Sequence, residues 1–320
     1  MTAPGGLGAP PSSNAEHLPV LLGPCIELLA PQPGHRFIDC TINGAGHSQV
    51  LLERSAPDGA LLGMDADPEA LAAAASRLAV FGPRLTLVHS NFRELGETAA
   101  HAGFAQVDGI LMDLGLSSRQ LGLSGRGFSF SHEGPLDMRF DITQGPTAAD
   151  LIATATPEEI ERTLREFGEE PRARRIAQAI ANARHQGTIR TTLDLANLVS
   201  RAIRQRGRIH PATRTFQALR IAVNDELGAL TVALPQAISL LRRGARLAVI
   251  SFHSLEDRIV KNFFASVSGR VVDDRRLPMA PEAPPAQIKI ITRRPVMASS
   301  DEVATNPRSR SARLRVAERV

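Results

Sequence analysis

The chain has 320 residues, of which 43% are hydrophobic, and this is enough for one large domain or two unequal domains with hydrophobic cores. Its apolar runs, such as 61–64 and 247–250, fall far short of the roughly 20 residues that span a bilayer, so the sequence excludes a transmembrane helix. Its two cysteines, Cys25 and Cys40, fit a reducing compartment and exclude a disulfide framework or a multi-thiolate metal site. We therefore expect a globular cytoplasmic protein with no membrane span and no metal.

Positive charge is concentrated in one stretch of the chain. The formal net charge is only +4, with a pI of about 9.9, yet nine arginines and one acid lie between residues 172 and 208. The arginines are Arg172, Arg174, Arg175, Arg184, Arg190, Arg201, Arg204, Arg206 and Arg208. Such a run forms either a solvated helical face or a phosphate-binding surface, and the pattern leaves both interpretations open.

Short apolar runs alternate with helical stretches from about residue 36, after a Gly-, Pro- and Ser-rich segment (1–15) that we predict to be a disordered tail. This alternation predicts an α/β fold with a doubly wound parallel sheet. The predicted strands are Arg36–Cys40, Ala60–Asp65, Leu85–His89 and Val107–Asp113. The predicted helices are Ser48–Arg54 and Pro68–Val80, the second with Asp67 as its N-cap.

After Asp113 the strand pattern stops, and helical segments are predicted at 157–167, 171–185 and 192–205. A single long helix at 216–241 and strands at 246–252 and 287–292 predict that the sheet then resumes. The expected division is a first sheet part at 16–118, a helical insertion at 119–218, a second sheet part at 219–305 and a basic, loosely ordered tail at 306–320.

A turn of small residues follows the first predicted strand and opens the next helix, from Asp39 to His47. In such a sheet, small residues let a nucleotide-like ligand approach the backbone at the carboxyl ends of the strands. Gln49 stands where a dinucleotide fingerprint needs a third glycine, which weakens a nicotinamide interpretation. Asp65 ends the second strand about 20 residues after Gly46, where a carboxylate can accept ribose hydroxyls. Since Asp67 already caps the helix, Asp65 has no predicted structural task.

The motifs along the chain resemble one family closely, from about His17 to Arg319. They are His17–Leu22, Gly46–Ser48, Asp113–Leu121, Arg126–Phe130, Gly134–Arg139, His210–Arg214, Phe216–Ile221, Ser251–Arg258 and Asn306–Ser311. The family is that of the RsmH (MraW) ribosomal RNA small-subunit methyltransferases. The resemblance implies a Rossmann-like class I methyltransferase fold with a helical insertion that recognises RNA. It also implies transfer of a methyl group from S-adenosyl-L-methionine to N4 of a decoding-centre (P-site) cytidine in 16S ribosomal RNA.

By position, the resemblance also implies the cofactor-binding residues, which are Ala45, Gly46, His47, Asp65, Phe92, Asp113 and Gln120. Phe92 follows the third predicted strand, where it either packs against adenine or belongs to the core. The family usually has glycine where Asn43 and Ala45 stand. Because asparagine tolerates positive φ and alanine adds only one methyl, we expect altered rather than lost cofactor affinity.

Methyl transfer from a sulfonium requires the acceptor nitrogen to be held about 3 to 3.5 Å from the methyl carbon. Cytosine N4 is a poor nucleophile, so a carboxylate or carbonyl that accepts its N–H hydrogens should assist the reaction. Asp113 is the first candidate, although the resemblance also allows it to bind the methionine amine of the cofactor. Asp137 and His253 are the alternatives, and His253 has a competing role as a local helix cap.

Candidate RNA-binding residues lie in the insertion and its entry loop. They are Arg126, Phe128, Arg139, Arg201, Arg204, Arg208 and Arg214. Phe128 or Phe130 would either stack on an extruded base or anchor the loop. Methylation at cytosine C5 needs a cysteine thiolate, commonly after the fourth strand, and the positions of Cys25 and Cys40 favour transfer to nitrogen instead.

The sequence leaves several other interpretations open. The substrate could be DNA or another RNA, although the arginines argue against a small molecule. The chain could also be a non-catalytic ribosome assembly factor, and a nicotinamide oxidoreductase is a more distant alternative. The expected partner is 16S ribosomal RNA within the small ribosomal subunit, and a homodimer is left open.

Overall fold

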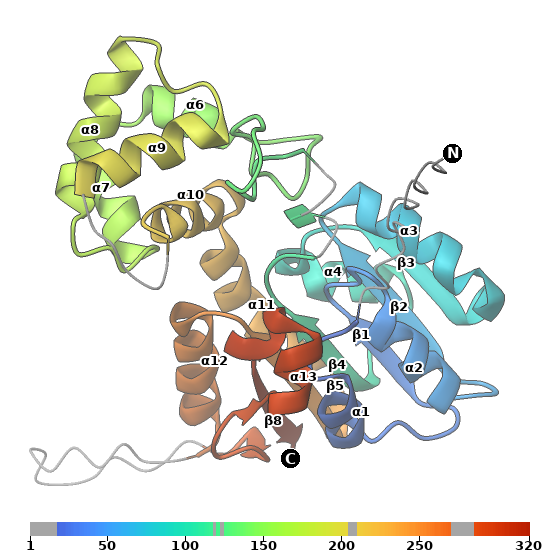
Figure 1. The fold of residues 1–320 in the computed structure, drawn as a ribbon. Helices are drawn as coiled ribbons and strands as arrows, with labels where there is room; N and C mark the ends of the chain where they lie inside the picture. The colour runs from blue at the N-terminus through green and yellow to red at the C-terminus, as the bar shows by residue number, and fades with distance from the viewer. Residues whose placement is uncertain (1–17, 118–119, 122–124, 204–209, 270–284) are drawn as a thin grey trace, which may run out of the picture.

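The computed structural model describes residues 18–117, 120–121, 125–203, 210–269 and 285–320 (Figure 1). The described chain forms one mixed sheet with helices on both faces and a separate lobe of helices. No helix among these residues is both long and apolar enough to cross a membrane.

The central sheet has the strand order β3-β2-β1-β4-β5-β8-β6, with β7 paired to β8. Strands β1 to β5 run parallel to one another, and β8 runs antiparallel to β5, β6 and β7. Their bounds are β1 Arg36–Asp39, β2 Ala60–Asp65, β3 Leu85–His89, β4 Val107–Asp113, β5 Leu241–Ser251, β6 Ile288–Ile290, β7 Val296–Met297 and β8 Arg313–Arg319. Strand order reverses between β1 and β4, so a ligand-binding crevice is expected at their carboxyl ends. This topology confirms the predicted doubly wound fold.

Two hydrophobic cores cover the two faces of the sheet. On one face, Leu51 and Leu78 pack with strand residues such as Phe37 and Ile250. The elements on that face include α1 Leu22–Leu29, α2 Gly46–Arg54 and α3 Pro68–Leu78. The opposite face is covered by α4 Leu95–His101, α11 Glu226–Leu240 and α12 Ser254–Val267. Side chains alternate along each strand, which is why successive residues enter opposite cores.

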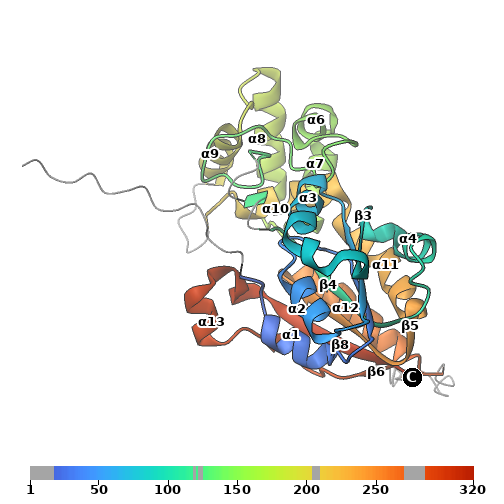
Figure 2. The same ribbon diagram turned by 90° about the vertical axis from the view of Figure 1, so that its right-hand side faces the viewer.

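The helical lobe has a core of its own. Its helices are α6 Ala148–Thr154, α7 Pro157–Glu166, α8 Ala173–His185, α9 Thr192–Ile203 and α10 Thr213–Asn224. Ile160, Ile176 and Val199 are among its fully buried side chains. Thr147 and Thr156 form capping boxes that start α6 and α7. Figures 1 and 2 show this insertion standing to one side of the sheet.

The prediction of a single helix at 216–241 is wrong. Asp225 adopts a left-handed conformation (φ 47°, ψ 43°) and separates α10 from α11. Consequently α10 packs in the core of the insertion and α11 packs on the sheet. A short polar residue such as aspartate tolerates this conformation, so the break carries no glycine or proline signal.

The prediction of a loosely ordered tail at 306–320 is also wrong. The segment contains the short helix η3 Pro307–Ser311 and then β8, which pairs with β5 inside the sheet. Leu314 and Val316 are fully buried, and Arg315 pairs with Asp257 on α12. The arginines between these apolar residues interrupt the apolar run, so the sequence pattern did not predict a strand here. The predicted N-terminal tail lies outside the described residues.

Candidate active site

A cavity opens at the carboxyl ends of β1, β2 and β4. It holds about 600 Å³ of space between atoms, open solvent at its mouth included. Residues that line it include Asn43, Asp65, Phe92, Gln120, Phe140 and Glu256. A smaller adjoining cavity contains Asp113 and Arg308 and shares Asn43 and Leu114 with the first.

The loop between β1 and α2 is built around positive backbone φ angles, 44° at Asn43 and 59° at Ala45. These are the two positions where the sequence resemblance leads us to expect glycine. A Cβ on Gly46 would lie 2.8 Å from Pro19 Cγ, so this position has little room for a side chain. Asp39 anchors the loop by accepting hydrogen bonds from Ser48 Oγ (2.5 Å) and Thr41 N (3.1 Å).

Asp65 lies at the end of β2 and lines the main cavity while remaining only 8% exposed. Its carboxylate accepts hydrogen bonds from Asn43 N (3.0 Å) and Asp67 N (2.9 Å). Burial raises the pKa of Asp65 to about 6, although these hydrogen bonds oppose the shift. The expectation that Asp65 has no structural task is wrong, because it holds two turns. A carboxylate has about four acceptor sites, so this leaves capacity for ribose hydroxyls.

Asp113 ends β4 and is fixed through its backbone. Its N–H donates to Thr41 Oγ1 (2.7 Å), and its carbonyl accepts from Asn43 Nδ2 (3.3 Å). Its Oδ2 lies 3.7 Å from His47 Nδ1, whereas Oδ1 is buried and has no hydrogen-bond partner among the described residues. Burial, followed by the nearby Asp39 and Glu256 carboxylates, raises the pKa of Asp113 well above its usual value. A buried acceptor of this kind suits a cationic ligand group.

Comparison with known proteins identifies the family. A model described as the MraW methylase family matches residues 14–320. The chain belongs to the MraW methylase family. It is 48% identical over 311 residues to the ribosomal RNA small subunit methyltransferase H of Geotalea daltonii. This match covers 96% of this chain and 100% of that protein. It is 52% identical over 308 residues to the protein of the same name from Thermomicrobium roseum. This match covers 96% of this chain and 94% of that protein.

S-adenosylmethionine, the cofactor of MraW methylases, fits the residues of the two cavities. Asp65 offers acceptors to ribose hydroxyls, and Phe92 provides an apolar wall next to it. Asp113 Oδ1, which has no hydrogen-bond partner among the described residues, offers an acceptor either to the methionine ammonium group or to the acceptor amine. The predicted residues Ala45, Gly46 and His47 are buried at the start of α2 and are not among the lining residues of either cavity.

The predicted cofactor residue Gln120 is held beside Asp65. Its Nε2 donates to Asp67 Oδ2 (2.9 Å), and its Oε1 accepts from Ser117 N (2.9 Å). Phe92 lines the cavity and also packs against the sheet core. The position of Phe92 therefore fits both interpretations, a wall for the adenine and a residue of the hydrophobic core.

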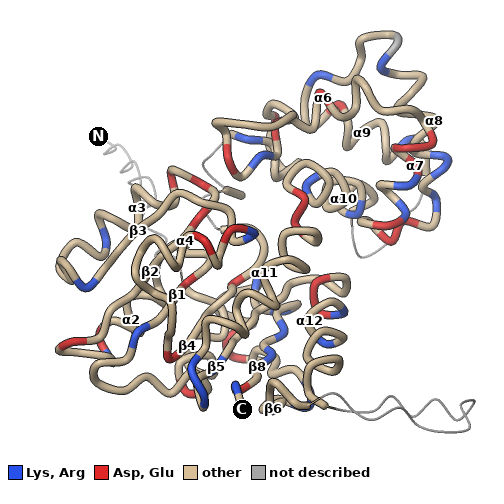
Figure 3. The backbone as a smooth tube through the Cα atoms, turned by 180° about the vertical axis from the view of Figure 1, so that it is seen from behind, with Lys and Arg blue, Asp and Glu red and all other residues tan. Residues whose placement is uncertain are grey.

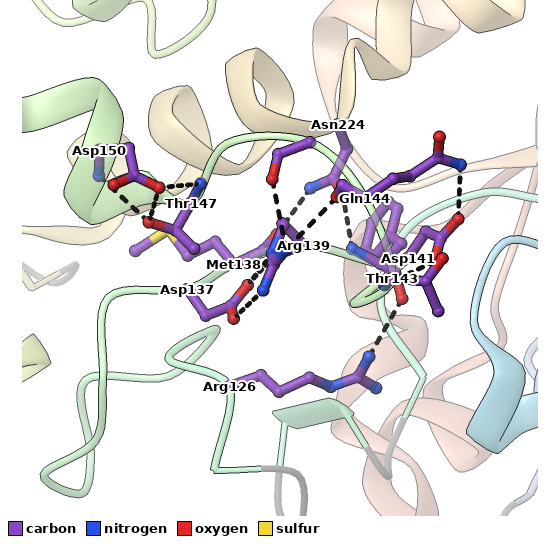
Figure 4. A network of polar contacts seen from close by, with 12 residues as sticks. Arg126, Asp137, Met138, Arg139, Asp141, Thr143, Gln144, Thr147, Asp150 and Asn224 are labelled. Atoms are coloured by element: carbon purple, nitrogen blue, oxygen red, sulfur yellow. Dashed lines mark hydrogen bonds and ion pairs between the residues drawn. The ribbon is translucent and has the colours of Figure 1, made fainter. Parts of the chain in front are cut away.

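The alternative catalytic candidates do not line either cavity. Asp137 is bound by the Arg139 guanidinium through two hydrogen bonds of 2.8 Å, and these bonds lower the pKa of Asp137 (Figure 4). His253 caps α12 by accepting a hydrogen bond from Glu256 N (3.4 Å). The structure thus brings Asp113 to the smaller cavity, while Asp137 forms an ion pair and His253 serves as a cap.

Sequence reasoning missed two buried carboxylates, Glu226 and Glu256, that line the main cavity. With His253 they offer ligand atoms within 4.8 Å of one another. Glu226 accepts two hydrogen bonds from Arg220 (2.7 and 2.9 Å), and Glu256 accepts from the backbone of Phe252 and His253. These contacts make the cluster an ion-paired wall. The sequence did contain a signal for Glu256, because a glutamate three residues after a helix-capping residue matches a capping box.

The candidate RNA-binding residues fall into different environments. Arg126 is buried and pairs with Asp67, and Phe128 is buried against Phe140. Arg139 pairs with Asp137. Arg201 and Arg214 are exposed, whereas Arg204 and Arg208 lie outside the described residues.

An open groove on α8 presents further arginines, Arg172, Arg174 and Arg175. All three are exposed, and Gln178 and Asn182 lie beside them. Figure 3 shows basic residues along the backbone of the insertion. The exposed cationic surface of the insertion therefore includes α8.

Proposed function

We propose that this MraW methylase transfers a methyl group from S-adenosylmethionine to N4 of a decoding-centre cytidine in 16S ribosomal RNA. The observation that carries the proposal is the buried Asp113 carboxylate oxygen at the end of β4, beside the cofactor cavity. This oxygen lacks a hydrogen-bond partner in the part of the chain that the structure describes. The relatives named ribosomal RNA small subunit methyltransferase H support the RNA substrate. A ribosomal substrate also implies a cytoplasmic location and the small subunit as partner.

When bound, S-adenosylmethionine supplies a methyl group on a positively charged sulfur. Asp65 would hold the ribose end, and Asp113 would attract the positive charge of the cofactor. Holding both ends fixed lowers the entropy cost of bringing the methyl group to the acceptor nitrogen. Burial excludes water and strengthens each of these electrostatic contacts.

The acceptor amine needs a hydrogen-bond acceptor, because cytosine N4 shares its lone pair with the ring. A carboxylate at the end of β4 can accept an N4–H hydrogen as the amine pyramidalises, and it can take the proton after transfer. We propose Asp113 for this task. Of Asp113, Asp137 and His253, only Asp113 lines one of the two cavities described above.

The two cysteines support transfer to nitrogen over transfer to carbon. Cys40 lines the main cavity, but burial and then the Asp39 carboxylate raise its thiol pKa well above the usual value. Burial likewise raises the pKa of Cys25. Addition to cytosine C6, which C5 methylation requires, needs a thiolate, and both sites disfavour that form.

The helical insertion is proposed to recognise RNA through phosphate contacts. Its exposed arginines on α8 and α9 include Arg174, Arg175 and Arg201. Arginine forks match phosphate oxygens and remain charged at all relevant pH values. The buried Arg126 is excluded from this surface by its ion pair with Asp67.

Nucleoside mass spectrometry after incubation with S-adenosylmethionine tests the proposed function. The purified protein is given unmodified 16S ribosomal RNA, assembled small subunits, or DNA of matched sequence. We expect N4-methylcytidine in RNA or subunits and none in DNA. C5-methylcytidine would refute the chemical assignment, and an unchanged cofactor with tight RNA binding would instead favour an assembly factor.

A further inference from the structure

One wall of the cofactor cavity comes from the insertion. Phe140 lines the cavity together with Ala66, Asn91 and Phe92, which follow β2 and β3. Because Asp65 lines the same cavity, a nucleoside whose ribose binds Asp65 could reach these residues with its base. The described segment 125–141 precedes α6 in the chain, and Phe140 lies near its end.

A chain of contacts links Phe140 to the ribose carboxylate. The Asp65 carboxylate accepts from Asp67 N (2.9 Å), and the Asp67 carboxylate pairs with the Arg126 guanidinium. Arg126 also donates to the Phe140 carbonyl (3.1 Å). Asp67 and Arg126 are 2% and 7% exposed, so little water competes with their ion pair.

Further contacts hold Phe140 from the other side. Its N–H donates to Asn224 Oδ1 (2.7 Å), and Asn224 Nδ2 donates to the Met138 carbonyl (2.7 Å). The Phe128 ring stacks on the Phe140 ring with centroids 5.6 Å apart. The backbone and ring of Phe140 are therefore fixed at the cavity.

A second bridge joins the following residue to the base side of the cavity. His89 Nε2 lies 3.0 Å from the Ala66 carbonyl and 3.6 Å from Asp141 Oδ2. This places the insertion segment against the turn after β2. The contacts span both the ribose and the base regions.

We propose that Phe140 is a cofactor-binding residue and that Arg126 is its positioning residue, so the insertion completes the S-adenosylmethionine site. Phe140 packs against the adenosine portion, while Arg126 holds the Phe140 backbone to the Asp65–Asp67 turn. This inference rests on the cofactor of the family and not on the proposed RNA target. An aromatic ring stabilises a stacked base without reading its identity, which suits a cofactor site.

Calorimetric titration with S-adenosylmethionine and S-adenosylhomocysteine tests this proposal without an activity assay. We expect Phe140→Leu to weaken binding about tenfold. The matched control is Phe130→Leu, in the same segment, because Phe130 stacks on His210 and packs against Phe216 instead of lining the cavity. Its affinity should stay within about twofold of wild type. Wild-type affinity in Phe140→Leu, or an equal loss in both variants, would overturn the proposal.

Hydrogen exchange on the wild-type protein decides the matter if Phe140→Leu fails to fold. S-adenosylhomocysteine should slow amide exchange at 136–141 as well as in the loop between β1 and α2. Slower exchange confined to that loop would overturn the proposal, because the insertion segment would then make no contact with the ligand.

Discussion

The sheet and the helical insertion hold their candidate functional residues in different ways. In the sheet, Asp65 and Asp113 are buried at strand ends, and each is fixed by hydrogen bonds from neighbouring loops. In the insertion, arginines such as Arg174 and Arg175 extend from the outer face of a helix into solvent. The comparison indicates that a catalytic group depends on backbone geometry, whereas a phosphate-binding surface depends mainly on accumulated charge.

At the junction between the two regions, the charged residue is buried and held by specific contacts, as in the sheet. Arg126 belongs to the insertion segment, yet it is buried and paired like a residue of the sheet. An isolated buried charge is costly, so this ion pair fixes how the segment meets the turn after β2. Substitutions in each region should therefore change different measurements.

The largest expected effect is at Asp113. Asp113→Asn should reduce the single-turnover methylation rate by roughly 100-fold or more at saturating cofactor and RNA, because an aligned proton acceptor contributes about 10² to 10⁴. RNA affinity should change far less. Asp137→Asn is the matched control, since Asp137 pairs with Arg139 outside both cavities. A native rate in saturated Asp113→Asn would make Asp113 a cofactor anchor only.

The next effect concerns cofactor affinity. Asp65→Ala should weaken S-adenosylmethionine binding by roughly 1 to 3 kcal/mol, because the ribose hydroxyls lose a charged acceptor. Calorimetry measures this change, and Asp58→Ala provides a control at an exposed aspartate. Equal affinity in wild type and Asp65→Ala would contradict the ribose assignment.

A pH series separates the charge of Asp65 from its shape. Burial raises the pKa of Asp65 to about 6, so the free protein binds a proton there as the pH falls from 7 to 5. Protonation removes the charged acceptor, and cofactor affinity should fall with it. The difference in affinity between wild type and Asp65→Asn should therefore narrow below pH 6. A constant difference would show that the charge of Asp65 does not contribute.

The smallest effect per residue is expected at the insertion surface. Replacing Arg174, Arg175 and Arg201 with glutamine should reduce the logarithmic salt slope of RNA binding by roughly 0.7 to 0.9 for each lost phosphate contact. Cofactor affinity should not change. Arg54→Gln, at an exposed position on α2, controls for a general loss of positive charge. An unaltered slope would leave the cluster as a solvated helical face.

The parts of the fold predicted well are those determined by local pattern. Strands Ala60–Asp65 and Val107–Asp113 appear with the predicted bounds, because buried parallel strands are continuous apolar runs that end at polar residues. The Asp67 cap is also confirmed, since the Asp-Pro step is a local signal.

The parts that were missed depend on contacts between distant residues. The apolar residues of β8 are recognisable only beside β5, and the left-handed Asp225 becomes explicable only once α10 and α11 are seen in different cores. Phe140 reaches the cofactor cavity through partners more than ten positions away in sequence, such as Asn224 and Arg126. Hydrophobic periodicity in the sequence does not indicate which distant residues come into contact in the fold.

Complementation tests the central claim most directly. A bacterial strain that lacks its own counterpart of this gene receives either the wild-type chain or Asp113→Asn, and its 16S ribosomal RNA is mapped by mass spectrometry. We predict one N4-methylated decoding-centre cytidine with the wild-type chain and little or none with Asp113→Asn at equal protein levels. Absence of this methyl group with the wild-type chain, or equal methylation with both, would contradict the account.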